Sequence, residues 1–155
     1  MSNSALKTIM RQLDSLALSP NRPDAQEPLI TFALSSHITT ELVLNQVSKT
    51  HLSVTLLTSI DAEHNEELDI FALALAARIS PLKLTTLEHQ LCLQLTFHCS
   101  PKTLKISLNE AIVLMRHMSG AIFTGAVSLM ENKEDLMDVL ATTVEHLSQP
   151  RLANV

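Results

Sequence analysis

Three short segments that alternate between apolar and polar residues follow one another early in the chain, and they constrain the fold more than any other feature. They lie around Ile30–Leu34, Leu42–Leu44 and Leu52–Leu56. An apolar residue at every second position is the pattern of a strand with one buried face. Two further segments of this kind lie around Leu82–Leu84 and Leu91–Phe97. Strands grouped in this way predict an α+β fold with a mostly antiparallel sheet of about five strands.

Helical periodicity surrounds these strands and is also present at both ends of the chain. Apolar residues recur at three- and four-residue spacing over residues 3–18, 66–79, 107–119 and 136–147. A capping box from Ser107 to Glu110 predicts the start of the third helix. Residues 121–130 continue this helix or form one more strand, and we favour the strand. We expect residues 1–149 to form a single domain and residues 150–155 to be a frayed tail.

Composition and charge exclude several classes of protein. The chain has 155 residues, a formal charge of −5, two Cys and no Tyr or Trp. A nucleic-acid ligand is not expected, because there is no basic stripe for phosphates and no Tyr or Trp platform for bases. Lys7, Arg11 and Asp14 interrupt any signal peptide, and the longest apolar run, Ile70–Ala77, is too short to span a membrane. We therefore expect a cytoplasmic location without membrane insertion.

Motifs that carry catalysis are missing from the sequence. The chain has two Gly, too few for a Gly-rich phosphate loop, and contains neither a GxSxG nor an HExxH motif. We expect a protein that is not an enzyme, with no catalytic residues and no cofactor. An enzyme whose residues converge only in space remains open.

The best candidate for a metal site in the sequence is His89-x-x-Cys92 with His98-Cys99. Side chains alternate between the two faces of a strand. His89 and Cys99 then share the face of Leu91, and Cys92 and His98 share the other. Four ligands split between two faces do not converge on one tetrahedral ion, so we expect no metal.

The helix predicted over residues 66–79 is apolar on nearly all sides, because small Ala residues surround the stripe of Leu68, Phe71 and Leu75. Such a helix is normally buried, either in a core or against a second subunit.

This order of elements resembles the class I type III secretion chaperones, which are small, acidic, cytoplasmic bacterial homodimers that serve virulence. The family has an amino-terminal helix, three strands, a dimer-forming helix, two strands and a closing helix. Here PLKLTTLEHQLCLQLTF is similar to the paired strands and SLNEAIVLMRHM to the closing helix. The resemblance covers roughly residues 5–120. Segment 121–149 lies beyond the family's usual end.

The resemblance implies a chaperone that binds the amino-terminal region of a secreted effector and keeps it export-competent. It implies partner-binding residues on the first helix and first strand: Leu6, Ile9, Leu13, Ile30, Phe32 and Leu34. It also implies a homodimer interface at Leu68, Phe71 and Leu75. In a second alignment with the family, residues 107–119 form the dimer helix, GAIFTGAVSLM is a strand, and residues 66–79 are an insertion. The alternative function is a small regulatory or ligand-binding domain with an apolar pocket between sheet and helices.

Overall fold

The computed structural model describes residues 3–63, 65–87 and 89–149. The predicted tail at 150–155 lies outside the described residues. The elements follow in the order α1 (Asn3–Ser15), β1 (Leu29–Ser35), β2 (Ile38–Gln46), β3 (Leu52–Asp61), α2 (Glu66–Ala76), β4 (Lys83–Leu87), β5 (Gln90–Cys99), α3 (Leu104–Met130) and α4 (Leu136–Ser148). The predicted α+β class is confirmed, with a helix near each end of the chain.

The five strands form one antiparallel sheet in the order β1-β2-β3-β5-β4. Each predicted strand segment overlaps one of these strands, although β4 begins at Lys83 and so excludes Leu82. The register places apolar residues opposite one another on a single face: Ile30 pairs with Leu42, Leu42 with Leu56, and Leu56 with Leu95. That face is buried, and it forms the core together with the apolar sides of the helices.

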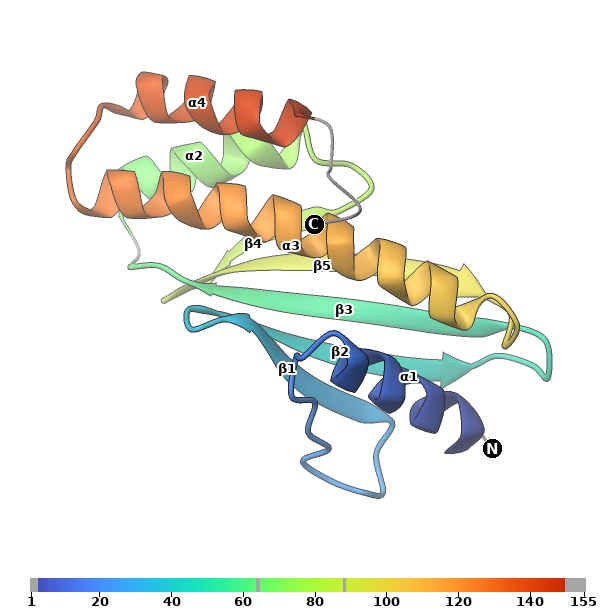
Figure 1. Ribbon diagram of the computed structural model, residues 1–155. Coiled ribbons are helices and arrows are strands. Elements are labelled where there is room, and N and C mark those ends of the chain that lie inside the picture. Colours follow the sequence, from blue (N-terminus) through green and yellow to red (C-terminus); the bar gives the residue numbers. More distant parts are fainter. Residues whose placement is uncertain (1–2, 64, 88, 150–155) are drawn as a thin grey trace.

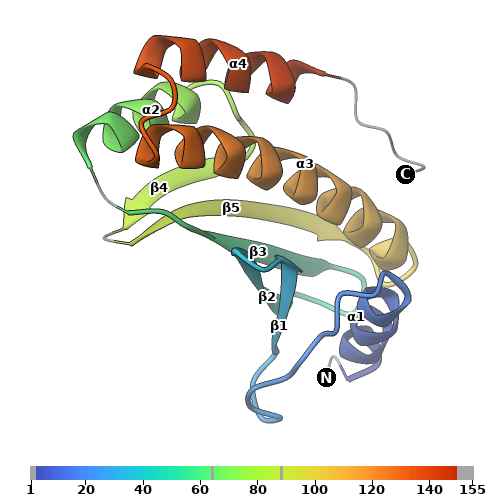
Figure 2. The same ribbon diagram turned by 60° about the vertical axis from the view of Figure 1, so that its left-hand side comes forward.

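The helices gather on one side of the sheet, where α3 runs obliquely across it, α2 lies over β4, and α4 lies on the outer side of α2 and α3 (Figures 1 and 2). Helix α1 packs against α3. The other face of the sheet carries mainly hydroxyl and amide side chains. On β3 these are Ser53, Thr55 and Ser59, and Thr55 forms a 3.0 Å hydrogen bond with Thr96 across to β5. One face of the sheet is therefore packed, and the other is mixed: it also carries the charged residues Glu41 and Lys83 and the half-buried apolar residues Val43 and Leu57.

A buried pair of hydroxyl groups interrupts the apolar face. Thr40 and Thr58 are 1% and 0% exposed, and their Oγ1 atoms lie 2.9 Å apart. Replacing Thr58 with Val leaves the Thr40 hydroxyl without this partner, so we expect a loss of about 1–3 kcal/mol of unfolding free energy. The Thr40→Val/Thr58→Val double variant should recover most of that loss, as urea unfolding would measure. An equal loss in the single and double variants would contradict this prediction.

Two predictions about the segment that forms α3 are wrong. The helix begins at Leu104, after Thr103, and not at the capping box of Ser107. It then continues without a break to Met130, so the strand favoured for residues 121–130 is wrong. Its buried residues Ile122, Ala126 and Leu129 keep the helical spacing and face the core. A short, almost wholly apolar segment fits a period of two and a period of 3.6 equally well, which is why the sequence pattern misled us.

The second alignment with the chaperone family is wrong for the same reason. It needs a strand at residues 121–130, where the structure has helix, and it treats residues 66–79 as an insertion. In the structure α2 lies between β3 and β4 and packs against α3, α4 and β4.

The length of α3 has a second implication. By length and composition alone α3 is apolar enough to cross a membrane, a test that the core helix of a globular protein passes as well. Here it packs against β3, β5 and the other three helices.

Candidate functional site

The three residues predicted to form the dimer interface lie on α2, and their side chains point into the core of the same chain. Leu68, Phe71 and Leu75 are 2%, 0% and 0% exposed. The Phe71 ring packs so closely against α3 that a Cβ atom added at Gly125 would lie 2.7 Å from its Cζ atom. These three side chains are covered within a single chain, and a second subunit cannot contact them without unpacking the helix.

The opposite side of α2 carries a second apolar stripe that the sequence analysis did not single out. Ile70 is 46% exposed and Leu73 is 76% exposed, and Ala77 is exposed one turn further on. We call Ile70, Leu73 and Ala77, the C-cap residue that follows the helix, the outer stripe of α2. The helix begins at the N-cap Asn65, whose side chain accepts a 2.7 Å hydrogen bond from the Leu68 N–H. This cap and the packed residues fix the rotation of the helix, and they leave Leu73 in solvent.

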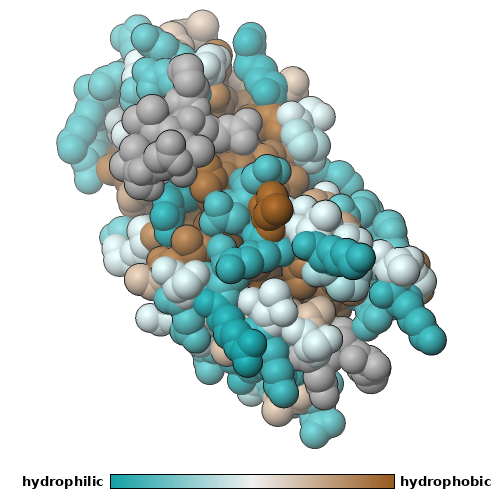
Figure 3. Space-filling view, turned by 45° about the vertical axis from the view of Figure 1, so that its right-hand side comes forward, coloured by the Kyte–Doolittle hydropathy of each residue, from teal (hydrophilic) through white to brown (hydrophobic). Residues whose placement is uncertain are grey.

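The residues predicted to bind a partner lie mostly in the core. Leu6, Ile9, Leu13, Ile30 and Phe32 are buried, and Leu34 is half-buried. Leu6 also lines a hollow of about 530 Å³ between α1 and the loop before β1, together with Met10 and the basic residues Lys7, Arg11 and Arg22. Figure 3 shows the side of the molecule where α3 begins, and there the hydrophobic residues form small areas separated by hydrophilic side chains.

Strands β1 and β4 form the two edges of the sheet. At the β1 edge, Asn21 exchanges two backbone hydrogen bonds of 2.8 Å with Thr31. The loop before β1 therefore covers the middle of that edge. The other edge is β4, a strand of five residues that ends at Leu87, whose side chain is 54% exposed.

A hollow lies at the end of the sheet where β3 leaves it. Its volume is about 630 Å³, and we call it the sheet-end cavity. Ala62, Phe123, Val127 and Met130 supply apolar surface, and Asp61, Glu63, Glu131, His37 and His89 supply polar groups. His37 Nδ1 lies 3.8 Å from Asp61 Oδ2, and His89 Nδ1 lies 3.9 Å from Glu63 Oε2. His37 also stacks on the Phe123 ring at a centroid distance of 5.3 Å.

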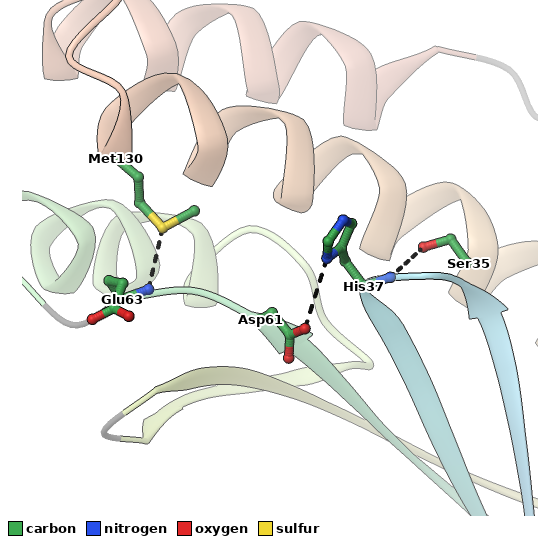
Figure 4. Close-up of polar contacts among 5 residues, drawn as sticks. All are labelled: Ser35, His37, Asp61, Glu63 and Met130. Carbon is green, nitrogen blue, oxygen red and sulfur yellow. Dashed lines mark hydrogen bonds and ion pairs between the residues drawn. The ribbon is translucent and has the colours of Figure 1, made fainter.

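Backbone hydrogen bonds hold the walls of this cavity together. Asp61 donates its N–H to the His37 carbonyl oxygen at 3.2 Å, and Ala62 donates to the His89 carbonyl oxygen at 3.1 Å. The Glu63 N–H lies 3.1 Å from Met130 Sδ (Figure 4). Three consecutive residues thus connect the β1–β2 turn, the β4–β5 turn and the end of α3.

The cysteine and histidine residues considered for a metal alternate as predicted along β5. Leu91, Leu93 and Leu95 are buried on one face, and Cys92 and His98 belong to the other, with continuous pairing to β3. His98 contacts His51 at 3.0 Å, and His89 lies at the opposite end of the strand. Burial and the nearby charge of Glu41 raise the pKa of Cys92, which keeps its thiol protonated. Among the residues that the structure describes, no group of three or more His, Cys, Asp or Glu side chains is placed to hold a metal ion.

Comparison of the chain with protein-family models, curated proteins and solved structures found no significant match.

Proposed function

We propose that the protein is a non-enzymatic, homodimeric chaperone of the cytoplasm that binds the amino-terminal region of a secreted effector. The observation that carries this proposal is the outer stripe of α2. A helix that is apolar on all sides is normally covered on all sides, and here Leu73 is left 76% exposed. A second copy of the chain is the simplest cover, since a two-fold axis brings identical apolar stripes together.

The order of the elements supports the same proposal. Helix, three strands, helix, two strands and a long helix is the order of the class I type III secretion chaperones that the sequence resembles. Helix α4 follows as an addition that packs against α3 and α2. A client would bind in extended form, with its backbone adding to a sheet edge and its apolar side chains entering hollows such as the one beside Leu6.

The oligomeric state tests the dimer. We expect the wild-type chain to elute at twice its mass of 17.1 kDa in size-exclusion chromatography with light scattering. Leu73→Asp should give monomers with an unchanged circular dichroism spectrum, because it places a charge in the interface and leaves the core intact. Ile106→Asp is the matched control, since Ile106 is 65% exposed at the start of α3 and outside the outer stripe. A wild-type monomer at tens of micromolar would overturn the dimer.

The client is tested separately. A tagged chain should retain one larger secreted protein from its native host, identified by mass spectrometry. The purified amino-terminal region of that protein should then bind the dimer directly, and the remainder of that protein should not. Binding through the folded remainder alone would contradict the chaperone function.

The sheet-end cavity favours the second candidate, a small ligand-binding or regulatory domain. Its volume of about 630 Å³ lies within the range of small-molecule sites. A small molecule that co-purifies with the chain, seen by native mass spectrometry, would support this function. An empty chain that captures an effector would exclude it.

A further inference from the structure

The sheet-end cavity combines an apolar interior with an acidic rim. Phe123, Val127 and Met130 come from the last turns of α3, whereas Asp61 is the last residue of β3 and Glu63 follows two residues later. Figure 4 shows His37 and Asp61 pointing toward each other below α3, with Met130 reaching down to the backbone of Glu63. Among the described residues that line the cavity there are three carboxylates and no Lys or Arg.

The carboxylates retain capacity to bind a cation. The two imidazole contacts, at 3.8 and 3.9 Å, are longer than a hydrogen bond, so they leave carboxylate oxygens available. The Asp61 and Glu63 side chains are 64% and 83% exposed and stand at the open rim. Glu131 is partly neutralised by Lys133, whose pKa is raised by its hydrogen bond to that carboxylate. The charge that an approaching ligand meets is therefore set by Asp61 and Glu63.

The walls are held in place before any ligand arrives. The N–H groups of Asp61, Ala62 and Glu63 are each bound to a different neighbouring segment. A site fixed in this way loses little entropy on binding. Its three walls come from parts of the chain that are far apart in sequence, so the cavity depends on the complete fold.

We propose that the sheet-end cavity binds a peptide segment in which Arg residues adjoin apolar residues. An Arg side chain fits this chemistry because its aliphatic stem packs on apolar surface and its guanidinium forms paired hydrogen bonds with a carboxylate. An adjoining Leu or Phe would occupy the space beside Phe123 and Val127. The acidic net charge of the chain, −5, draws such a segment toward the protein. This proposal does not depend on the outer stripe of α2, none of whose residues lines the cavity.

The experiment measures binding of a fluorescein-labelled peptide that alternates Arg and Leu to the full chain, by fluorescence anisotropy. We expect saturable binding that weakens at least ten-fold when Gln replaces Arg and at least ten-fold when Ser replaces Leu. The Asp61→Asn/Glu63→Gln variant should bind at least ten-fold more weakly than wild type. Circular dichroism would establish that this variant is folded, as expected because both side chains are exposed.

The matched control removes the same charge elsewhere. Glu110→Gln/Glu145→Gln changes two exposed carboxylates on α3 and α4 and should leave the affinity within two-fold of wild type. Equal weakening in the two double variants would show general attraction to an acidic protein and would overturn the site. Complete displacement of the peptide by equimolar spermidine would show that the cavity takes a small cation, which also overturns the proposal. If the wild-type chain does not bind the peptide, whether it is a monomer or a dimer, the proposal is also overturned.

Discussion

Replacing Phe71 with Asp is expected to unfold the protein, whereas the same replacement at Leu73 should leave the monomer folded. Phe71 is fully buried and Leu73 is 76% exposed on the same helix. Loss of a buried Phe side chain costs about 3–5 kcal/mol, and a buried carboxylate adds a desolvation penalty. Because a domain of this size is stable by only about 5–15 kcal/mol, the Phe71 change removes most or all of that margin.

Alanine variants measure the same contrast without burying a charge. In urea unfolding under conditions where the chain is monomeric, Phe71→Ala should lose about 3–5 kcal/mol and Leu73→Ala less than about 0.5 kcal/mol. The pair shares one helix, so differences in helix propensity contribute little. If Leu73→Ala proved the more damaging change, α2 would have to be rotated, and the outer stripe would be the inner one.

Gly125→Ala is the second change with a large expected effect. A Cβ atom at Gly125 would lie 2.5 Å from Thr143 Oγ1 and 2.7 Å from Phe71 Cζ, closer than van der Waals contact permits. Both neighbours are buried and belong to α4 and α2, so neither can move without disturbing its own helix. We expect a loss of about 1–3 kcal/mol from this overpacking, despite the better helix propensity of Ala.

Gly120 provides the matched control on the same helix. Among the described residues, a Cβ atom there would have no neighbour within 4 Å apart from the adjoining residues and backbone of its own helix. Gly120→Ala should therefore stabilise the protein by up to about 1 kcal/mol, because Gly is a poor residue for a helix interior. Thermal or urea unfolding of the two variants gives shifts of opposite sign. A stabilising Gly125→Ala would mean that α2, α3 and α4 do not pack as closely as described.

The fold could be predicted largely from side-chain periodicity. Strands β2, β3 and β5 alternate between buried and more exposed positions over most of their length, so the alternation is visible in the sequence. The pattern failed at residues 121–130 because this segment is apolar on most positions and contains Gly125. A Gly in such a segment is typical of a strand bulge or a turn, whereas here it allows three helices to meet.

The candidate sites were harder to predict. The sequence identified α2 as an unusually apolar helix, but periodicity cannot say which of two apolar stripes faces solvent when both are present. The cap at Asn65 and the packing of Phe71 against Gly125 decide this, and the second contact joins residues 54 positions apart. The sheet-end cavity is lined by residue 37, residues 61–63, residue 89 and the end of α3. No local pattern connects these positions, because the sheet register and the path of α3 bring them together.

Helix α3 mechanically connects the two ends of the molecule. Near its start, Asn109 accepts a hydrogen bond from Gln12 of α1, and near its end Gly125 is enclosed by Phe71 and Thr143. At 1.5 Å per residue these two points lie about 24 Å apart on one continuous rod. If a partner tilted α1, α3 would tilt with it, and the movement at the other end of α3 would displace α2 and α4. Gly120 lies between the two points and is the residue of lowest helix propensity in that stretch.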